Sequence, residues 1–222
     1  MKVPPLLLRA IIFTVVVVVA IFIGYSMLAG NKTLPVYGPK DLNPRLVDES
    51  VRKKQDHRIG AFTLTDQRGR TITEKDLQGK IYIADFFFTT CEGICLDMSR
   101  NMAQIQEEFA DEESLMLLSH SVTPEIDSVP ALMAYGEIHG ADNDRWLLLT
   151  GERKHIYNLA RKEYFAAKHD GDGGPNDMVH TENFVLVDKE KRIRGFYDGT
   201  NDKEVEQAIE DIKTLLKEYE DQ

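Results

Sequence analysis

The sequence predicts an α/β fold in which a mixed central sheet is flanked by helices. Apolar runs short enough to be strands alternate with stretches of helical periodicity, and this pattern is typical of crossover units in a parallel sheet. The last two strand-like runs are separated only by a short turn, so they form a hairpin and add an antiparallel part. A third observation, an uncharged run near the amino terminus, predicts a transmembrane helix ahead of this domain.

The expected elements follow in order along the chain. Residues 61–65 alternate between apolar and polar side chains, as a half-buried strand does. The run KIYIADFFF at 80–88 is apolar except for Asp85, and residues 115–122 are similar, so both are expected to be buried strands. The remaining expected strands are residues 146–149, 183–187 and 192–197, and the expected helices are residues 92–110, 128–139, 152–164 and 202–219.

The predicted membrane helix, residues 10–29 (AIIFTVVVVVAIFIGYSMLA), contains no charged side chain. A helix of this length spans roughly 30 Å of hydrocarbon. Lys2 and Arg9 lie before it, and the positive-inside rule therefore keeps residues 1–9 in the cytoplasm as a short tail. A cleaved signal peptide is the alternative, but its apolar region is shorter, and the residues before Gly30 make a poor cleavage site. We expect an uncleaved single-pass anchor, with the soluble domain on the periplasmic side of a bacterial cytoplasmic membrane.

The chain after this anchor divides into a linker and one domain. Residues 30–55 contain three prolines and few large apolar side chains, as expected for an extended, semi-rigid spacer. Residues 56–222 are numerous enough to bury a single core. The formal net charge is −10, and the chain has no long run of Lys and Arg, which argues against nucleic acid as a partner.

The only two cysteines, Cys91 and Cys95, follow directly after the strand expected at 80–88. Reactive and ligand-binding residues favour the carboxyl ends of strands in open α/β sheets. The spacing predicts that both sulfurs lie on one face of a helix, near its N-terminus, where the helix dipole favours a thiolate. Such a pair can bind a soft ion such as Cu(I) or form a disulfide. Two buried, inert cysteines are the alternative interpretation.

The position of each methionine and histidine in the expected elements predicts its role. Met98 and Met102 continue the cysteine stripe, but methionines at helical spacing usually fill a core, so we assign both to packing. His180 stands apart because it precedes a strand after a long polar loop, where a neutral imidazole can supply a third metal ligand. The histidines interpreted as structural or surface residues are His57, His120, His139 and His155.

From about residue 62 to residue 200 the chain resembles the Sco/SenC family of membrane-anchored copper proteins. The specific part of the resemblance is the cysteine spacing together with a late histidine. The sequence departs from the family pattern at Glu92 and Leu96, where proline is usual, and at Thr123, where the family has Asp. The matching stretches include FTLTD at 62–66, FFFTTC at 86–91 through Cys95, SVTPEID at 121–127 and VHT at 179–181.

The resemblance implies a thioredoxin-like fold and one copper per chain, as Cu(I), Cu(II) or both, bound by Cys91, Cys95 and His180. It implies a copper chaperone rather than an enzyme, supporting assembly of the dinuclear copper centre of cytochrome c oxidase. The implied partners are the copper-bearing subunit of the oxidase and a copper donor. Because the compartment is oxidising, an external thiol reductant is expected as a further partner.

Two other functions remain open on the sequence. The first is a membrane-tethered thiol-disulfide oxidoreductase in which Cys91 attacks and Cys95 resolves; its C-x-x-x-C spacing differs from the C-x-x-C of ordinary thioredoxins. The second is a non-catalytic binding or sensing domain that keeps the fold and the ligands. His180 discriminates the oxidoreductase from the copper protein, because dithiol exchange does not need an imidazole at that position.

Overall fold

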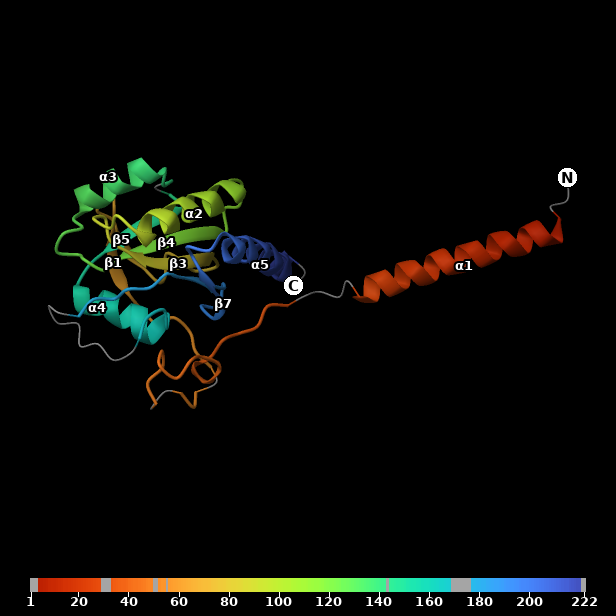
Figure 1. Cartoon of the computed structure of the whole chain (residues 1–222), viewed down its shortest axis with the longest axis horizontal. Coiled ribbons are helices and arrows are strands. Elements are labelled where there is room, and N and C mark those ends of the chain that lie inside the picture. The colour runs from red at the N-terminus through yellow and green to blue at the C-terminus, as the bar shows by residue number, and fades with distance from the viewer. Residues whose placement is uncertain are drawn as a thin grey trace. The chain divides into compact units, whose positions relative to one another are not determined.

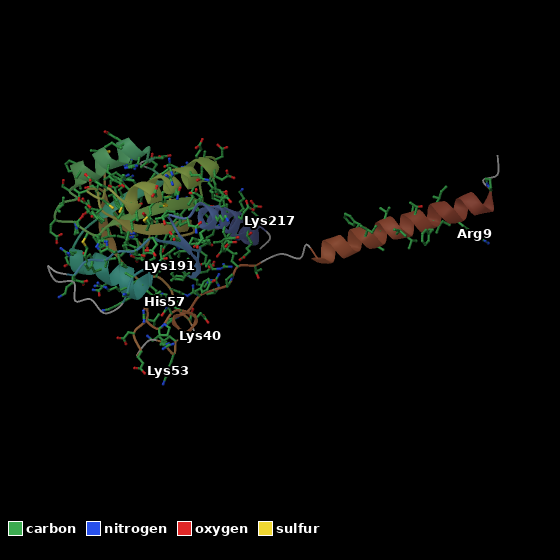
Figure 2. The ribbon with its side chains drawn as sticks, in the orientation of Figure 1. Arg9, Lys40, Lys53, His57, Lys191 and Lys217 are labelled. Carbon is green, nitrogen blue, oxygen red and sulfur yellow. The ribbon has the colours of Figure 1, made fainter. Side chains whose placement is uncertain are left out.

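The computed structural model describes residues 4–28, 33–49, 52–54, 56–142, 144–168 and 177–220. The chain divides into two compact units, of which the first ends at Thr33 and the second begins at Leu34. The first unit contains helix α1 (Pro5–Leu28), which covers most of the predicted membrane segment and has Arg9 near its N-terminal end (Figure 2). Within the described residues, no helix offers a stretch both long and apolar enough to cross a membrane.

The second unit is built on a seven-stranded sheet with the strand order β2-β1-β5-β4-β3-β6-β7 (Figure 1). The three central strands β3, β4 and β5 are parallel, and the other neighbouring pairs are antiparallel. The predicted α/β fold with a mixed sheet is therefore confirmed. The strands are β1 (Thr63–Asp66), β2 (Thr71–Thr73), β3 (Ile81–Phe87), β4 (Leu115–Ser121), β5 (Trp146–Thr150), β6 (Asn183–Val187) and β7 (Ile193–Asp198).

Helices cover both faces of this sheet. On one face, α2, α3 and α5 enclose a core that contains Met98 and Met102, both fully buried as the packing assignment predicts. On the other face, α4 and the π-helical turn after it enclose a second core. The helix expected at 152–164 is thus split in two. The helical elements are α2 (Ile94–Glu108), α3 (Val129–His139), α4 (Arg153–Asn158), the π-helical turn (Leu159–Glu163), α5 (Asp202–Glu220) and a short 3₁₀ turn (Pro39–Asp41).

Strand β2 is an element that the sequence did not predict. It pairs with β1 through a tight turn in which the Asp66 carboxylate accepts hydrogen bonds from the backbone N–H groups of Arg68 and Arg70. Gly69 completes the turn in the left-handed region, with φ of 77°, where glycine meets no Cβ penalty. A strand of only three residues leaves too short a pattern for periodicity to detect.

The second compact unit begins at an earlier residue than the composition of the chain predicts. Residues 30–55 were expected to form a linker, but the compact unit begins at Leu34. The Tyr37 N–H donates a 2.9 Å hydrogen bond to the carbonyl of Ile193, which forms an isolated bridge beside β7. The guanidinium of Arg194, itself buried, donates to the carbonyl of Leu34 at 2.8 Å. Pro39 begins the short 3₁₀ turn, so this segment is not extended throughout, and its backbone is bound to the domain.

Candidate metal centre

The two cysteines lie near the ends of the parallel strands β3 and β4, with Cys91 in the turn between β3 and α2 and Cys95 at the start of α2. The Cys91 N–H donates to the carbonyl of Phe88 at 3.2 Å, so Cys91 closes a turn rather than beginning the helix. Gly93 precedes the helix with φ of −121° and ψ of −123°, which are not helical values, and Cys95 sits in the first turn of α2. The prediction that both cysteines share one helical face is therefore wrong. Their spacing across the turn nevertheless brings the thiols together.

The two thiols are free and hydrogen-bond each other, yet their environments differ. Partial burial of Cys91 opposes ionisation, but hydrogen bonds from the Cys95 thiol and from the backbone N–H groups of Gly93 and Cys95 outweigh it. The pKa of Cys91 is accordingly lowered. Burial, followed by the hydrogen bond with Cys91, raises the pKa of Cys95 to about 12. Cys91 is thus the more accessible thiol and the first to ionise.

His180, the third predicted ligand, lies beside the same turn. Its ring is edge-on to the ring of Phe88, with centroids 6.2 Å apart, and its side chain is exposed. Strand β6 runs antiparallel to β3, so the residues that precede β6 extend past the carboxyl end of β3. Among the described residues, however, no three His, Cys, Asp or Glu side chains are grouped closely enough to hold a metal ion. The structure brings the two thiols together and places His180 nearby, but does not close a three-ligand site.

A buried carboxylate that the sequence reasoning did not single out holds this turn in place. Asp127 is fully buried and accepts hydrogen bonds from the Thr89 hydroxyl at 2.5 Å and, more weakly, from the Thr89 N–H. It also accepts from the hydroxyls of Ser121 at 2.5 Å and Thr123 at 3.0 Å. Asp127 therefore joins the end of β4 to the turn that carries Cys91. The signal in the sequence is a pair of hydroxyl residues closely followed by an acid.

Two further buried polar side chains lie on the central strands. Asp85 on β3 has one carboxyl oxygen without a hydrogen-bond partner among the described atoms, and burial raises its pKa to about 7. Its charge also contributes to the high pKa of Cys95. His120 on β4 is fully buried with Nε2 unpartnered, and burial lowers its pKa to about 4, which supports its interpretation as a structural residue.

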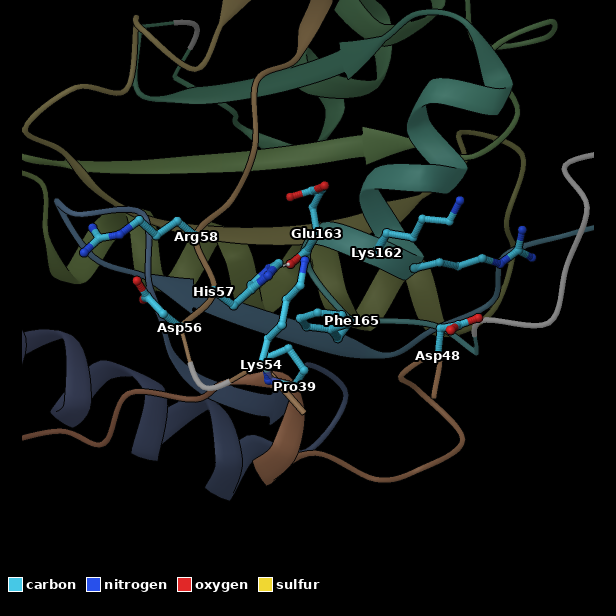
Figure 3. Close-up of a pocket in the computed structure, with 10 residues that line it drawn as sticks. Pro39, Asp48, Lys54, Asp56, His57, Arg58, Lys162, Glu163 and Phe165 are labelled. Carbon is cyan, nitrogen blue, oxygen red and sulfur yellow. Dashed lines mark hydrogen bonds between the residues drawn. The ribbon is translucent and has the colours of Figure 1, made fainter. Parts of the chain in front are cut away.

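A cavity of about 640 Å³ lies elsewhere, between the segment that joins the domain and the end of the π-helical turn (Figure 3). His57 hydrogen-bonds the backbone carbonyl of Glu163 at 2.7 Å, and its ring lies tilted against the ring of Phe165 with centroids 4.5 Å apart. The basic side chains of Arg58 and Lys162 point in different directions in Figure 3 and do not converge on one ligand position. None of the three predicted metal ligands lines this cavity. The candidate site is therefore the cysteine turn.

Comparison with known proteins points to a single family. The SCO1/SenC family model matches residues 50–217. A SCO1/SenC family lipoprotein from Bacillus anthracis str. Ames is 32% identical, with a TM-score of 0.65 over 74% of this chain and 98% of that one. BsSco, described as a member of the Sco family of cytochrome c oxidase assembly proteins with a disulfide switch, is 28% identical, with a TM-score of 0.61 over 73% and 95%. Yeast Sco1 with copper bound is 26% identical, with a TM-score of 0.54 over 71% and 90%.

Proposed function

Because the chain belongs to the SCO1/SenC family, we propose that it is a membrane-anchored copper-binding protein that supports assembly of the dinuclear copper centre of cytochrome c oxidase. The observation that carries the proposal is the pair of free, hydrogen-bonded thiols at the end of β3 with His180 beside the same turn. The copper bound to the yeast relative and the assembly role of BsSco support it.

The proposed ligands are Cys91, Cys95 and His180, with one copper per chain. Thiolates select Cu(I), and an imidazole adds a ligand that also suits Cu(II), so the site can hold either state. The thiols fit this role because they interact with each other and Cys91 is only partly buried. Binding requires loss of both thiol protons. It also requires His180 to move toward the sulfurs, because no three-ligand cluster is present among the described residues.

The same thiols link copper binding to redox state. A disulfide between Cys91 and Cys95 leaves no thiolate for the metal, so oxidised protein cannot bind copper at these residues. An oxidising compartment favours that disulfide. The proposed partners are therefore an external thiol reductant, a copper donor and the copper-bearing subunit of the oxidase. Oxidised protein should bind no copper at the thiols until a reductant is added.

The proposed location is the periplasmic side of a bacterial cytoplasmic membrane, with residues 10–29 as a single anchor. Its support is the uncharged composition of that segment and the positive charges of Lys2 and Arg9 before it. The description of the Bacillus anthracis relative as a lipoprotein agrees with membrane attachment. Alkaline phosphatase fused after Gln222 should be active, because it folds only where disulfides form, and an expressed but inactive fusion would reverse the proposed orientation.

Copper loading of the full chain in detergent, reduced and kept anaerobic, tests the ligands. We expect one tightly bound Cu(I) per wild-type chain and none in Cys91→Ser or Cys95→Ser. His180→Ala should bind more weakly and lose the Cu(II) form first. His139→Ala is the matched control, because it removes a half-buried imidazole from α3. An unchanged Cu(II) spectrum at full stoichiometry in His180→Ala would exclude His180 from the site.

A thiol-disulfide oxidoreductase remains the second candidate, favoured by the unequal thiols. An accessible thiol of lowered pKa next to a buried thiol of raised pKa suits attack by Cys91 and resolution by Cys95. Turnover with a disulfide substrate, measured in wild type and His180→Ala, separates the candidates. Efficient reduction that survives His180→Ala would favour the oxidoreductase over the copper protein.

A further inference from the structure

The segment that precedes β6 displays a methionine beside the proposed histidine ligand. Met178 is 39% exposed, Val179 is 3% exposed, and His180 is exposed again. In an extended segment, side chains two positions apart point to the same face. With buried Val179 between them, Met178 and His180 both face solvent.

The exposure of Met178 is unusual within this chain. Met98 and Met102 are fully buried, and Met178 is the one methionine among the exposed large apolar residues of the described part of the chain. A thioether normally fills gaps in a core, and exposing it gives up the free energy of burial. Its thioether is therefore accessible to a ligand from solvent, unlike the buried thioethers of Met98 and Met102.

The segment is also held in place, so the exposure does not come from a loose end. Asp177 forms a bidentate ion pair with Arg161, with distances of 2.6 and 2.5 Å, and its carbonyl accepts a hydrogen bond from Arg153 at 2.7 Å. On the other side of His180, Thr181 is buried and its hydroxyl accepts from the N–H of Asn183 at 3.1 Å. Met178 and His180 are thus presented between two fixed points.

The chemistry of the two side chains matches the proposed cargo. Thioether sulfur is a soft ligand that selects Cu(I), and imidazole also binds copper. The position matches as well, because the His180 ring contacts Phe88, the first residue of the cysteine turn. Both side chains are exposed, so copper can reach them from solvent without rearrangement of the fold.

We propose that Met178 and His180 form a capture site that binds Cu(I) before the thiols do. In the transfer step, two copper–sulfur bonds form to Cys91 and Cys95, and the bond to the Met178 sulfur breaks. The two thiol protons pass to solvent, His180 stays bound, and copper remains Cu(I), so no electron is transferred. The inference rests on the proposed copper function, but it assigns a role to a residue outside the cysteine pair.

The direct test is methyl NMR of the full chain in detergent, labelled with [¹³C-methyl]methionine. Cys91→Ser/Cys95→Ser removes the transfer ligands, and Cu(I) is added anaerobically as its acetonitrile complex. We expect the Met178 methyl signal to shift and saturate near one equivalent, and His180→Ala to abolish the shift. If the double variant does not fold, the oxidised wild-type chain titrated with redox-inert Ag(I) gives the same readout. An unshifted Met178 signal in the folded sample would overturn the proposal.

The kinetic test compares two leucine substitutions in the reduced wild-type background. Leucine keeps the apolar surface but lacks the sulfur, so Met178→Leu separates metal capture from a simple apolar contact. Met116→Leu is the control, because Met116 is part-exposed at the other end of the sheet, where it pairs with Tyr82. We expect Met178→Leu to slow Cu(I) transfer from a bicinchoninate complex about tenfold, a typical loss for a group that supports a metal site, with unchanged final stoichiometry.

The two tests separate failure of this inference from failure of the proposed function. Equal loading rates in Met178→Leu and wild type would refute capture by Met178 while the thiol site stands. A wild-type chain that binds no Cu(I) at its thiols would refute the proposed function, and the Met178 methyl shift would still report whether the pair binds copper.

Discussion

Each end of the central sheet buries a carboxylate, but the groups that bind this carboxylate differ between the two ends. At the cysteine end, Asp127 accepts hydrogen bonds from the uncharged groups of Thr89, Ser121 and Thr123. At the opposite end, where β6 finishes, Asp188 is paired with Arg192 at 2.8 Å and Arg194 at 3.1 Å. Within the described residues, no ion pair joins Asp127 to a cationic side chain.

This difference fits the roles that we propose for the two ends. The Arg194 guanidinium also pairs with Glu218 at 2.7 Å and binds the carbonyls of Leu34 and Pro35, so it fixes the point where the chain joins the domain. A cation there is structural. At the cysteine end, a nearby cationic side chain would repel an incoming metal ion, whereas hydroxyl and amide donors order the turn without adding positive charge. The buried carboxylate is thus paired with cations at one end and held by uncharged donors at the other, where we propose that copper binds.

The largest expected effect comes from removing the cation at the structural end. Arg194→Met leaves the Asp188 and Glu218 carboxylates buried without this partner, and breaking a buried pair costs about 3–5 kcal/mol. The exposed pair of Arg68 with Asp144 provides a matched control, since Arg68→Met should cost less than about 1 kcal/mol. Urea unfolding of both variants measures the difference. Equal losses would show that the Arg194 cluster is no more important than a surface ion pair.

A pH-dependent effect should follow from the uncompensated carboxyl of Asp85. The folded-state pKa of Asp85 is about 7, against an ordinary 3.8, so the folded protein favours the protonated carboxyl. The contribution of Asp85 to the free energy of unfolding is therefore fully present below pH 4 and is lost as the pH rises through 7. Each pKa unit corresponds to about 1.4 kcal/mol, and relaxation around a buried charge reduces the total. We therefore expect Asp85→Asn to stabilise the fold by about 2–3 kcal/mol at pH 8. At pH 4 it should have little effect.

His120 gives the opposite slope and must be considered in the same titration. Its folded-state pKa is about 4 against an ordinary 6.5, so its contribution is complete above pH 6.5 and is lost as the pH falls through 4. The Asp85→Asn variant keeps His120, so the free energy of unfolding of this variant should decline steadily as the pH falls. In the wild type, the opposite pH dependences of Asp85 and His120 partly cancel. A variant that differs from wild type equally at pH 4 and pH 8 would rule out Asp85 as the titrating group.

Much of this fold could be predicted because its central strands are buried on both faces. The apolar runs of β3 and β4 leave few other interpretations, and the hairpin of β6 and β7 is joined by a short turn. Strand β2 could not be predicted, because it depends on the Asp66 carboxylate organising a turn. The early junction at Leu34 was missed for a related reason. It depends on bonds to Arg194, 160 residues away in the sequence.

The candidate site shows the same division between residue type and geometry. Two cysteines and a late histidine stand out by their chemistry and spacing, and the resemblance to the Sco/SenC family makes them a predicted ligand set. Their arrangement is not, because the non-helical backbone of Gly93 moves Cys91 out of α2. Asp127 reaches the cysteine turn across 38 residues of sequence, so its importance appears only once the chain is folded.

A smaller effect on stability, but a clear one on copper, is expected at the cysteine end. Asp127→Asn keeps the shape but replaces one acceptor with an amide that cannot serve both Ser121 and Thr123, at a cost of about 1–2 kcal/mol. Because the turn then loosens, Cu(I) affinity should fall about tenfold, as it does when groups that orient metal ligands are lost. Unfolding and competition with a Cu(I) chelator measure the two quantities. Lost stability with unchanged affinity would mean that the thiols do not depend on Asp127.

The smallest effects are expected from two methionines that share α2 with Cys95 and that we assign to packing. Met98 and Met102 are fully buried in the core beneath the helix. Leucine has a similar volume, so Met98→Leu and Met102→Leu should each cost less than about 1.5 kcal/mol. Cu(I) stoichiometry, affinity and loading rate should stay at wild-type values, in contrast to Met178→Leu. Slower loading in either core variant, with the fold intact, would show that thioethers below the cysteine turn also reach the metal, and that burial does not separate packing methionines from binding ones in this protein.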